Sequence, residues 1–309
     1  MNTLLNYPGG EVGDGGITMS DLEHIAIERF KAASEMSLTH YGKPLVVCIS
    51  GGKDSSVITE LALRAGIPVE FMHNHTTADA PETVRFVRSE FKRLEELGYK
   101  CTQNMPTYKG QRTSMWSLIP QKLMPPTRLV RYCCAVLKET GGAGRFIATG
   151  VRWAESASRK NSRGIYEKNG TKESRVILNN DNDDCRMLFE NCRLQAKRTV
   201  NPIIDWKNDD VYGFLEDAKT PLNPLYAEGW CRVGCVGCPM AGRVTRELEF
   251  ARWPKYKNLY LLAFRNLLEE RAARGAYTSW QTPEEVFNWW MEYDVLPGQM
   301  QMDDYLEEL

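Results

Sequence analysis

A glycine-rich loop with one lysine and three serines is the stretch of this sequence best suited to bind a phosphate chain. Glycines let the backbone approach an anion, and the free amides and dipole of a helix N-terminus favour negative charge. The lysine adds a positive charge and the serines add hydroxyl donors. An ordinary strand-to-helix turn needs neither, so the loop predicts a nucleotide pyrophosphate site without the Walker spacing. Its residues follow an apolar run at 45–49 and are Ser50, Gly51, Gly52, Lys53, Asp54, Ser55 and Ser56.

Five of the nine cysteines fall in two groups that could bind a metal. Four thiolates complete a zinc or iron–sulfur centre, and a C-x-x-C pair brings two of them to one site. Adjacent cysteines suit a single tetrahedral zinc poorly, because neighbouring side chains diverge, whereas a cluster offers them separate irons. We predict one [4Fe–4S] cluster on Cys133, Cys134, Cys235 and Cys238, with zinc or unliganded buried cysteines as alternatives. Cys231 is an alternative ligand or a free thiol that carries sulfur.

Two arginines follow an apolar run at residues 146–151, where an open α/β sheet binds its ligands. Arg152 and Arg159 could grip phosphate or sulfate oxygens bidentately, and a surface pair bridged to Glu155 is the alternative. Gly150 ends the run and is counted with the nucleotide-binding residues. His73 and His75 end another expected strand, where a histidine contacts ribose or phosphate or is merely exposed.

Alternating strands and helices must position these residues. Apolar runs predict strands, helical periodicity predicts helices between them, and Ser20 with Glu23 could cap the first helix. This order predicts an α/β fold with a doubly wound, mostly parallel sheet. The polar stretch 160–200 breaks the rhythm and is interpreted as an insertion with one hairpin. The expected strands are 45–49, 67–73 and 146–151. The expected helices are 21–37, one after the glycine loop that runs through 61–64 and stops near Gly66, 81–97, 248–267 and 283–291.

The bulk composition is that of a folded enzyme-sized chain. The 309 residues are 42% hydrophobic and 26% charged, with a formal net charge of −1, which gives no global reason to bind nucleic acid or membranes. The N-terminus lacks the pattern of a secretion signal, and the sequence contains no apolar stretch long enough to span a membrane. We therefore expect a cytoplasmic protein whose cysteines stay reduced.

The loop resembles the Ser-Gly-Gly-x-Asp-Ser fingerprint of the PP-loop ATP pyrophosphatases. Members bind ATP, grip its β,γ-pyrophosphate and attach AMP to a substrate oxygen, after which a nucleophile displaces AMP. The resemblance implies Mg²⁺ to bridge the phosphates, with Asp54 as a candidate ligand.

Four further stretches resemble the phosphoadenosine phosphosulfate reductase branch of this superfamily, over about residues 44–242. They imply an adenine nucleotide alpha-hydrolase-like fold. The pairing of Cys-Cys with C-x-x-C, and Lys138 after the first pair, is similar to the [4Fe–4S] adenylylsulfate reductases. The four stretches are 73–83, 150–159, 201–212 and 222–226.

Two departures from the reductases shape the expected function. No cysteine follows Cys238 to act as the C-terminal nucleophile of sulfite-releasing members, and Lys53 and Asp54 are retained as ATP would require. The expectation is an ATP pyrophosphatase-type sulfurtransferase of the nucleic-acid thiolation type, with Lys53, Asp54, Arg152 and Arg159 as catalytic residues. The alternatives are a sulfonucleotide reductase that releases sulfite and a non-catalytic, cluster-bearing nucleotide sensor or regulatory subunit.

The acceptor and partners are left open by the sequence. Residues 151–200 carry eleven lysines and arginines against seven carboxylates, an excess of +4 that could contact tRNA or DNA, or form a solvated loop. A sulfur donor or reductant protein is expected. The expected domains are an N-terminal arm (1–19), an α/β domain (20–242) and a C-terminal helical region (243–309) that packs on the sheet domain, dimerises or presents a partner surface.

Overall fold

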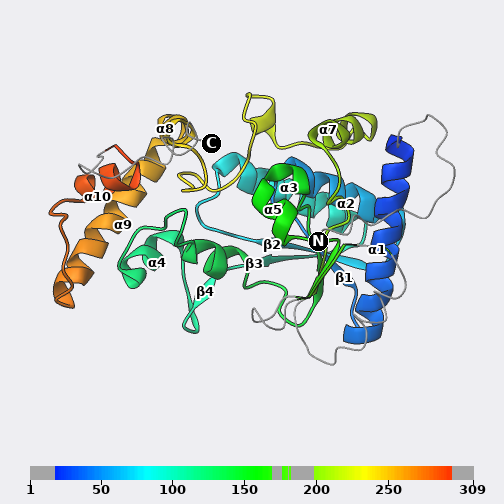
Figure 1. Cartoon of the computed structure of the whole chain (residues 1–309), viewed down its shortest axis with the longest axis horizontal. Coiled ribbons are helices and arrows are strands. Elements are labelled where there is room, and N and C mark those ends of the chain that lie inside the picture. The colour runs from blue at the N-terminus through cyan, green and yellow to red at the C-terminus, as the bar shows by residue number, and fades with distance from the viewer. Residues whose placement is uncertain (1–17, 169–175, 180, 182–197, 294–309) are drawn as a thin grey trace, which may run out of the picture. The chain divides into compact units, whose positions relative to one another are not determined.

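The protein is represented by a computed structural model that describes residues 18–168, 176–179, 181 and 198–293. The expected arm lies almost wholly outside these residues. The strands are β1 (Leu45–Cys48), β2 (Val69–Asn74), β3 (Lys100–Asn104), β4 (Thr107–Tyr108), β5 (Gln111–Arg112), β6 (Phe146–Ala148), β7 (Tyr166–Lys168), β8 (Val176–Leu178) and β9 (Arg198–Val200). The α-helices are α1 (Met19–Tyr41), α2 (Lys53–Ala65), α3 (Pro81–Glu96), α4 (Met115–Lys122), α5 (Ala157–Ser162), α7 (Asn208–Asp217), α8 (Arg243–Arg252), α9 (Pro254–Ala273) and α10 (Pro283–Trp290) (Figure 1). Three short helices complete the described elements: η1 (Cys134–Lys138), η2 (Trp153–Glu155) and η3 (Pro224–Tyr226).

Seven strands form one sheet in the order β3-β2-β1-β6-β9-β7-β8, and β4 and β5 form a separate hairpin. The pairs β2–β3, β1–β6 and β6–β9 are parallel, with Val46 opposite Ile147 and Ile147 opposite Thr199. Strand β1 is nearly all buried, as a strand covered on both faces must be. The predicted α/β architecture, a mostly parallel sheet with flanking helices, is confirmed.

The described residues divide into two compact units. The first comprises Met1–Val47, Lys53–Val69 and Gly144–Pro221, and the second comprises Cys48–Gly52, Glu70–Ala143 and Leu222–Leu309. The chain therefore passes from the second unit into the first between Gly52 and Lys53. Each unit has its own buried residues and its own candidate site.

In the first unit, α1 packs on α2, and α2 packs on α7. The stretch predicted as an insertion adds strands to the sheet. Strand β7 pairs antiparallel with both β8 and β9, so β7 and β8 form the expected hairpin at the sheet edge. Helix α5 precedes the hairpin.

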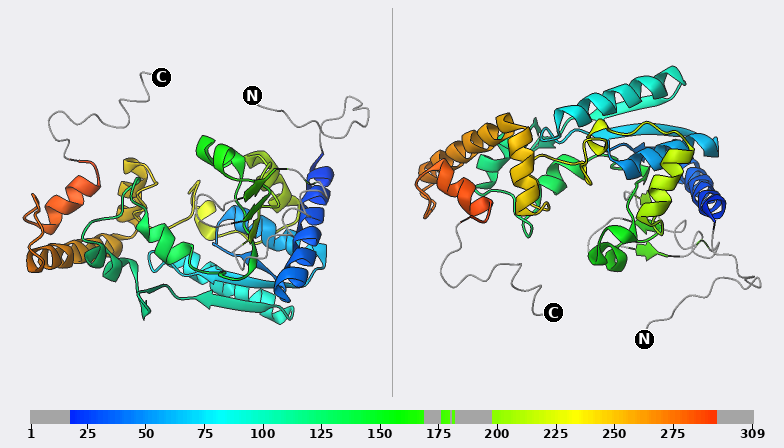
Figure 2. Two further views of the ribbon diagram at one scale, coloured as in Figure 1. Left: turned by 60° about the horizontal axis from the view of Figure 1, so that its bottom comes forward. Right: turned by 90° about the horizontal axis from the view of Figure 1, so that it is seen from above.

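In the second unit, the C-terminal helices enclose an aromatic core. Helix α9 packs against α4, α8 and α10, which Figure 2 shows in two further views. The run predicted as one helix from 248 to 267 is two helices, because Trp253 leaves the helical conformation before Pro254, with φ −125° and ψ 69°. Cys133 and Cys235 belong to the same buried cluster as the aromatic residues of these helices, which are Phe250, Tyr260, Phe264, Phe287 and Trp290.

Among the described residues, no helix combines the length and the apolar character that a membrane span requires.

Candidate nucleotide site and metal centre

Gly51 takes a conformation that only glycine adopts readily. Its φ is +79°, and an added Cβ would lie 2.7 Å from Cγ2 of Thr83. The buried amide of Asn223 donates to the Gly51 carbonyl and to Oγ1 of Thr83, both at 3.1 Å. The first glycine is thus required by the packing of the protein itself. Sequence reasoning noted Asn223 only as part of a motif, although an asparagine before a proline in a loop is a signal for such a side-chain bond.

Gly52 is different, because neither its backbone conformation nor its packing excludes a side chain. Its φ is outside the positive range, and the nearest atoms to an added Cβ are Oγ of Ser50 and the hydroxyl of Tyr226, both at 3.5 Å, which is ordinary van der Waals contact. The Gly52 amide donates to Oγ of Ser50 at 3.4 Å. Gly52 directly precedes the N-terminus of α2, where amides and the helix dipole attract an anion.

Asp54, in the first turn of α2, is held by two cations. Arg152 donates from Nε to Oδ1 at 2.6 Å, and Lys53 pairs with Oδ2 at 3.2 Å. The Arg152 side chain is 1% exposed and also donates to the Trp206 carbonyl at 3.1 Å and to Oδ1 of Asn208 at 2.9 Å. Arg152 therefore fixes the Asp54 carboxylate from within the protein. Lys53 is partly exposed and also lies 5.9 Å from the centre of the Tyr212 ring.

Gly150 allows β6 to approach α2. An added Cβ would lie 2.8 Å from the backbone oxygen of Asp54, so any larger residue would displace the first turn of α2. Ser55 and Ser56 are buried in this helix. Arg159, in contrast, is partly exposed and pairs with Glu155, which also accepts the backbone amide of Arg152.

His73 lies in the second unit and is 4% exposed. Its Nδ1 bonds the carbonyl oxygen of Ile49 at 2.8 Å, directly before the glycine loop. The histidine thus braces the end of the strand that leads into the loop. A contact with the nucleotide stays a prediction.

The four predicted metal-binding cysteines gather in the second unit. Cys134, Cys235 and Cys238 all act electrostatically on Cys133. The Cys133 thiol donates a hydrogen bond to Cys134 and thereby lowers the pKa of Cys134 to about 6. Burial raises the pKa of Cys235 to about 11, and the ammonium group of Lys138 opposes that rise. Cys231 is exposed, and its thiol lies 3.9 Å from the Gly229 carbonyl oxygen.

The spacing of these sulfur atoms bears on the choice between a cluster and a single zinc ion. A tetrahedral zinc with bonds of about 2.3 Å holds its sulfur atoms about 3.8 Å apart. Cys133 and Cys134 lie within hydrogen-bonding distance of each other. Within the described part of the chain, however, no three cysteine sulfurs lie within 4.8 Å of one another. A [4Fe–4S] cluster, in which each thiolate binds its own iron, does not require that close spacing, and the cluster stays a prediction.

The C-x-x-C loop is shaped by the C-terminal helices. Gly237 has a φ of +71°, and an added Cβ would lie 2.6 Å from Phe250 and 2.9 Å from Tyr260. Tyr260 donates its hydroxyl to the Val236 carbonyl at 3.0 Å, and the Gly237 amide donates to Glu249 at 2.6 Å. The helices thus fix the backbone between Cys235 and Cys238.

In the described part of residues 151–200, most lysine and arginine side chains do not form an exposed basic surface. Arg152, Lys168 and Arg198 are buried. Arg159 and Arg163 pair with glutamates, which leaves Lys160 as an exposed lysine beside them. The other five cations lie outside the described residues. The described residues therefore add no support for a nucleic-acid contact here.

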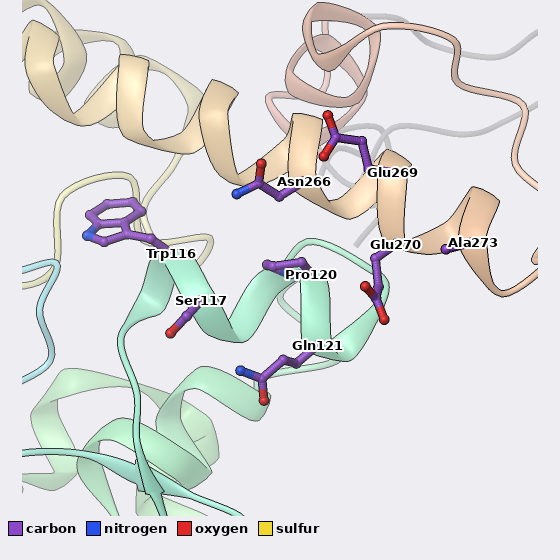
Figure 3. A pocket seen from close by; sticks show the side chains of 8 residues that line it. All are labelled: Trp116, Ser117, Pro120, Gln121, Asn266, Glu269, Glu270 and Ala273. Carbon is purple, nitrogen blue, oxygen red and sulfur yellow. The ribbon is translucent and has the colours of Figure 1, made fainter.

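A surface pocket of about 530 Å³ lies between α4 and α9 (Figure 3). Trp116 lines one end, and Glu269 and Glu270 make the α9 side acidic. None of the residues predicted from the sequence lines it. Two carboxylates would repel a triphosphate, so this pocket is not the nucleotide site.

Residues 44–241 match the family model described as the phosphoadenosine phosphosulfate reductase domain. This match covers well over half of the chain. The chain belongs to the phosphoadenosine phosphosulfate reductase family. The predicted family is confirmed.

Relatives of this family member include named reductases and uncharacterised proteins. The adenosine 5'-phosphosulfate reductase of Burkholderia cepacia is 24% identical over 65% of this chain and 71% of its own length. Two uncharacterised proteins of Methanocaldococcus jannaschii are 28% and 25% identical over 62% and 70% of this chain. The chain spans only about two fifths of the length of these two, 40% and 41%.

Solved structures show a looser likeness to this family member. Phosphoadenylyl-sulfate reductase from Candida auris is 12% identical, with a TM-score of 0.41 over 72% of this chain and 98% of that chain. The U34-tRNA thiolase of Methanococcus maripaludis, solved with its [4Fe-4S] cluster, is 14% identical, with a TM-score of 0.41 over 81% of each chain. Scores this low carry no functional inference.

Proposed function

We propose that the chain is an ATP-dependent sulfurtransferase of the phosphoadenosine phosphosulfate reductase family. It adenylates a substrate oxygen, releases pyrophosphate and supports transfer of sulfur to that substrate, with a [4Fe–4S] cluster on Cys133, Cys134, Cys235 and Cys238. The observation that supports it best is the arrangement of Lys53, Asp54 and Arg152 at the start of α2.

The loop residues suit the release of pyrophosphate. A substrate oxygen attacks the α-phosphorus of ATP, a new P–O bond forms, and the bond to the β,γ-pyrophosphate breaks. Negative charge then grows on the leaving group, which the amides at the start of α2 and the ammonium of Lys53 stabilise. Asp54 is oriented by Arg152 and is the candidate ligand for Mg²⁺.

In the second half of the reaction a sulfur nucleophile attacks the adenylated carbon, and AMP leaves with the oxygen. The four cysteines would hold the cluster, which when bound supplies iron and sulfide chemistry to the protein. Exposed Cys231 is the candidate sulfur carrier, because it lies at the surface four residues before Cys235. A tRNA or DNA acceptor and a separate sulfur donor protein are part of the proposal.

The test is chromatography of adenine nucleotides after anaerobic incubation of cluster-loaded protein with Mg·ATP, in the presence of tRNA or of DNA in separate arms. We expect AMP and pyrophosphate with one acceptor, and none from Lys53→Ala. Lys92→Ala is the matched control, since its side chain is 80% exposed on α3. Unchanged pyrophosphate release by Lys53→Ala would contradict the mechanism.

The names of the relatives favour a second candidate, a sulfonucleotide reductase. It predicts sulfite from adenosine or phosphoadenosine phosphosulfate and a thiol reductant, with no need for ATP. The third alternative, a nucleotide sensor or regulatory subunit, predicts ATP binding without AMP or sulfite in any arm.

A further inference from the structure

Two histidines and an aspartate converge where β2 ends. His73 is in β2, His75 follows the strand, and Asp79 lies in the turn before α3. One ligand atom from each lies within 4.8 Å of the other two. All three belong to the second unit. The proposed ATP reaction uses neither His75 nor Asp79, so this group of three side chains needs a separate explanation.

His73 is set up to present a lone pair. Its Nδ1 lies 2.8 Å from the carbonyl oxygen of Ile49, and a carbonyl only accepts, so Nδ1 carries the hydrogen. The other ring nitrogen, Nε2, is then the unprotonated one. Histidines that bind metals are held in this way, with one ring nitrogen donating to a backbone carbonyl and the other binding the ion.

His75 and Asp79 supply the other two atoms. Nδ1 of His75 is buried, has no hydrogen-bond partner and lies 3.7 Å from Oδ2 of Asp79. A buried polar atom without a partner destabilises the folded chain, and an ion bound between the two residues would offset that cost. The amide of Thr76 donates to the same Asp79 oxygen at 3.0 Å and aims the carboxylate.

We propose that His73, His75 and Asp79 bind a divalent transition-metal ion of the zinc class, separate from the cysteine cluster and independent of the ATP reaction. Two imidazoles and one carboxylate suit Zn²⁺ or Fe²⁺ and leave coordination positions open, whereas Mg²⁺ prefers oxygen ligands. Ligand atoms around a tetrahedral ion with bonds of about 2.0–2.2 Å lie about 3.3–3.6 Å apart. The His75–Asp79 distance of 3.7 Å is already close to that spacing.

The surroundings favour an anion at the open positions. Arg88 and Arg112 act electrostatically on His75 from exposed positions, so a hydroxide or a phosphate oxygen bound to the ion would face guanidinium groups. The site also adjoins the cysteines. The backbone of Asp79 pairs with that of Cys235, and its Oδ1 lies 4.0 Å from the Cys235 sulfur.

The experiment uses the full, cluster-loaded chain, chelated under anaerobic conditions and then given Zn²⁺ alone. Calorimetry measures affinity, and zinc-edge X-ray absorption identifies the ligands without interference from iron. We expect one Zn²⁺ per chain with imidazole nitrogen and oxygen neighbours. His75→Ala should weaken binding at least about 100-fold, and His24→Ala, on α1, should not change it.

Iron content and the melting temperature show whether each variant keeps its fold and its cluster. His75→Gln replaces the alanine variant if that one does not fold. Sulfur neighbours at the zinc edge, undiminished binding by the His75 variants, or no zinc binding by the unaltered protein would each overturn the proposal. None of these results depends on ATP turnover.

Discussion

Arg152 donates a 2.6 Å hydrogen bond from Nε to Oδ1 of Asp54, across 98 residues of sequence. Its remaining nitrogens donate to Trp206 and Asn208, so the guanidinium is fully engaged within the protein. An arginine held in this way is a positioning residue, since it orients the carboxylate at the start of α2. Arg159, paired with Glu155 near the surface, is the arginine more free to turn toward a ligand.

Arg152→Lys should lower stability and slow pyrophosphate release together. Lysine keeps the charge but cannot reach three acceptors, so buried acceptors lose their donors at a cost of about 2–4 kcal/mol. Arg159→Lys should change the unfolding free energy by less than about 0.5 kcal/mol. Denaturant unfolding and release kinetics on both variants measure this. Equal stability of the two variants would show that the Arg152 contacts contribute little.

Alanine at the two loop glycines should separate packing from ligand binding. Gly51→Ala meets Thr83 and a positive φ, so it should destabilise the protein by about 1–3 kcal/mol. Gly52→Ala meets nothing closer than 3.5 Å and should fold normally, yet bind ATP weakly, because its methyl group would stand between the loop and phosphates bound at the start of α2. Thermal unfolding and calorimetry with ATP provide the measurements. Normal ATP affinity in Gly52→Ala would place the phosphates elsewhere.

Gly237→Ala should prevent assembly of the cluster. The added methyl group would lie within 3 Å of Phe250 and Tyr260, so the loop between Cys235 and Cys238 must move. Gly234→Ala is the matched control, because an added Cβ meets nothing within 4 Å there. Iron and sulfide content after anaerobic purification should fall in the first variant only. Full iron in Gly237→Ala would mean that this loop does not hold the cluster.

Cysteine substitutions should identify which four of the five clustered thiols bind iron. Cys238→Ser should lose most of its iron and the brown colour that an iron–sulfur cluster gives. Cys231→Ser should keep both, because Cys231 is exposed and is not among the cysteines that interact with Cys133. If Cys231 carries sulfur, its variant still releases pyrophosphate but forms no thiolated product. Loss of iron from Cys231→Ser would show that Cys231 binds iron and that one of the four predicted cysteines does not.

Glu249 should make stability depend on pH. Burial raises the pKa of this carboxyl from its ordinary 4.5 to about 7, although the Gly237 amide opposes the rise. A raised pKa means that the stability from the protonated form is present below pH 4.5 and is lost as pH rises through 7. Glu249→Gln should therefore gain relative stability from pH 6 to pH 8.5, by about 1.4 kcal/mol. Melting curves of both proteins across this range test it, and parallel curves would refute it.

The sequence predicted the elements that depend on local patterns of residues. The apolar run before the glycine loop predicted β1, and the periodicity after it predicted α2, because both are local patterns. The cap of α1 was predicted at Ser20 with Glu23, which was wrong. Thr18 and Asp21 form the capping box, since several polar residues near a helix start compete for that place and only the geometry chooses.

The sequence could not predict contacts between residues that lie far apart in the chain. Nothing near Arg152 shows that its guanidinium reaches Asp54 instead of solvent, because the sheet order that joins them is a property of the whole fold. The burial of Lys168 and Arg198 was missed for the same reason: a stretch dense in charge was interpreted as surface, and two of its cations lie inside. The role of Asn223 at Gly51 likewise depends on elements 172 residues apart.

The contact of Tyr260 with Val236 has a consequence for how the protein matures. A ribosome makes the four cysteines before it makes α9 and α10, yet those helices shape the loop that carries two of the cysteines. A nascent chain that exposes all four thiols still lacks the backbone that spaces them. If the four cysteines hold the proposed cluster, iron and sulfide delivered during synthesis would meet an unformed site, and productive insertion would follow the packing of α9 and α10.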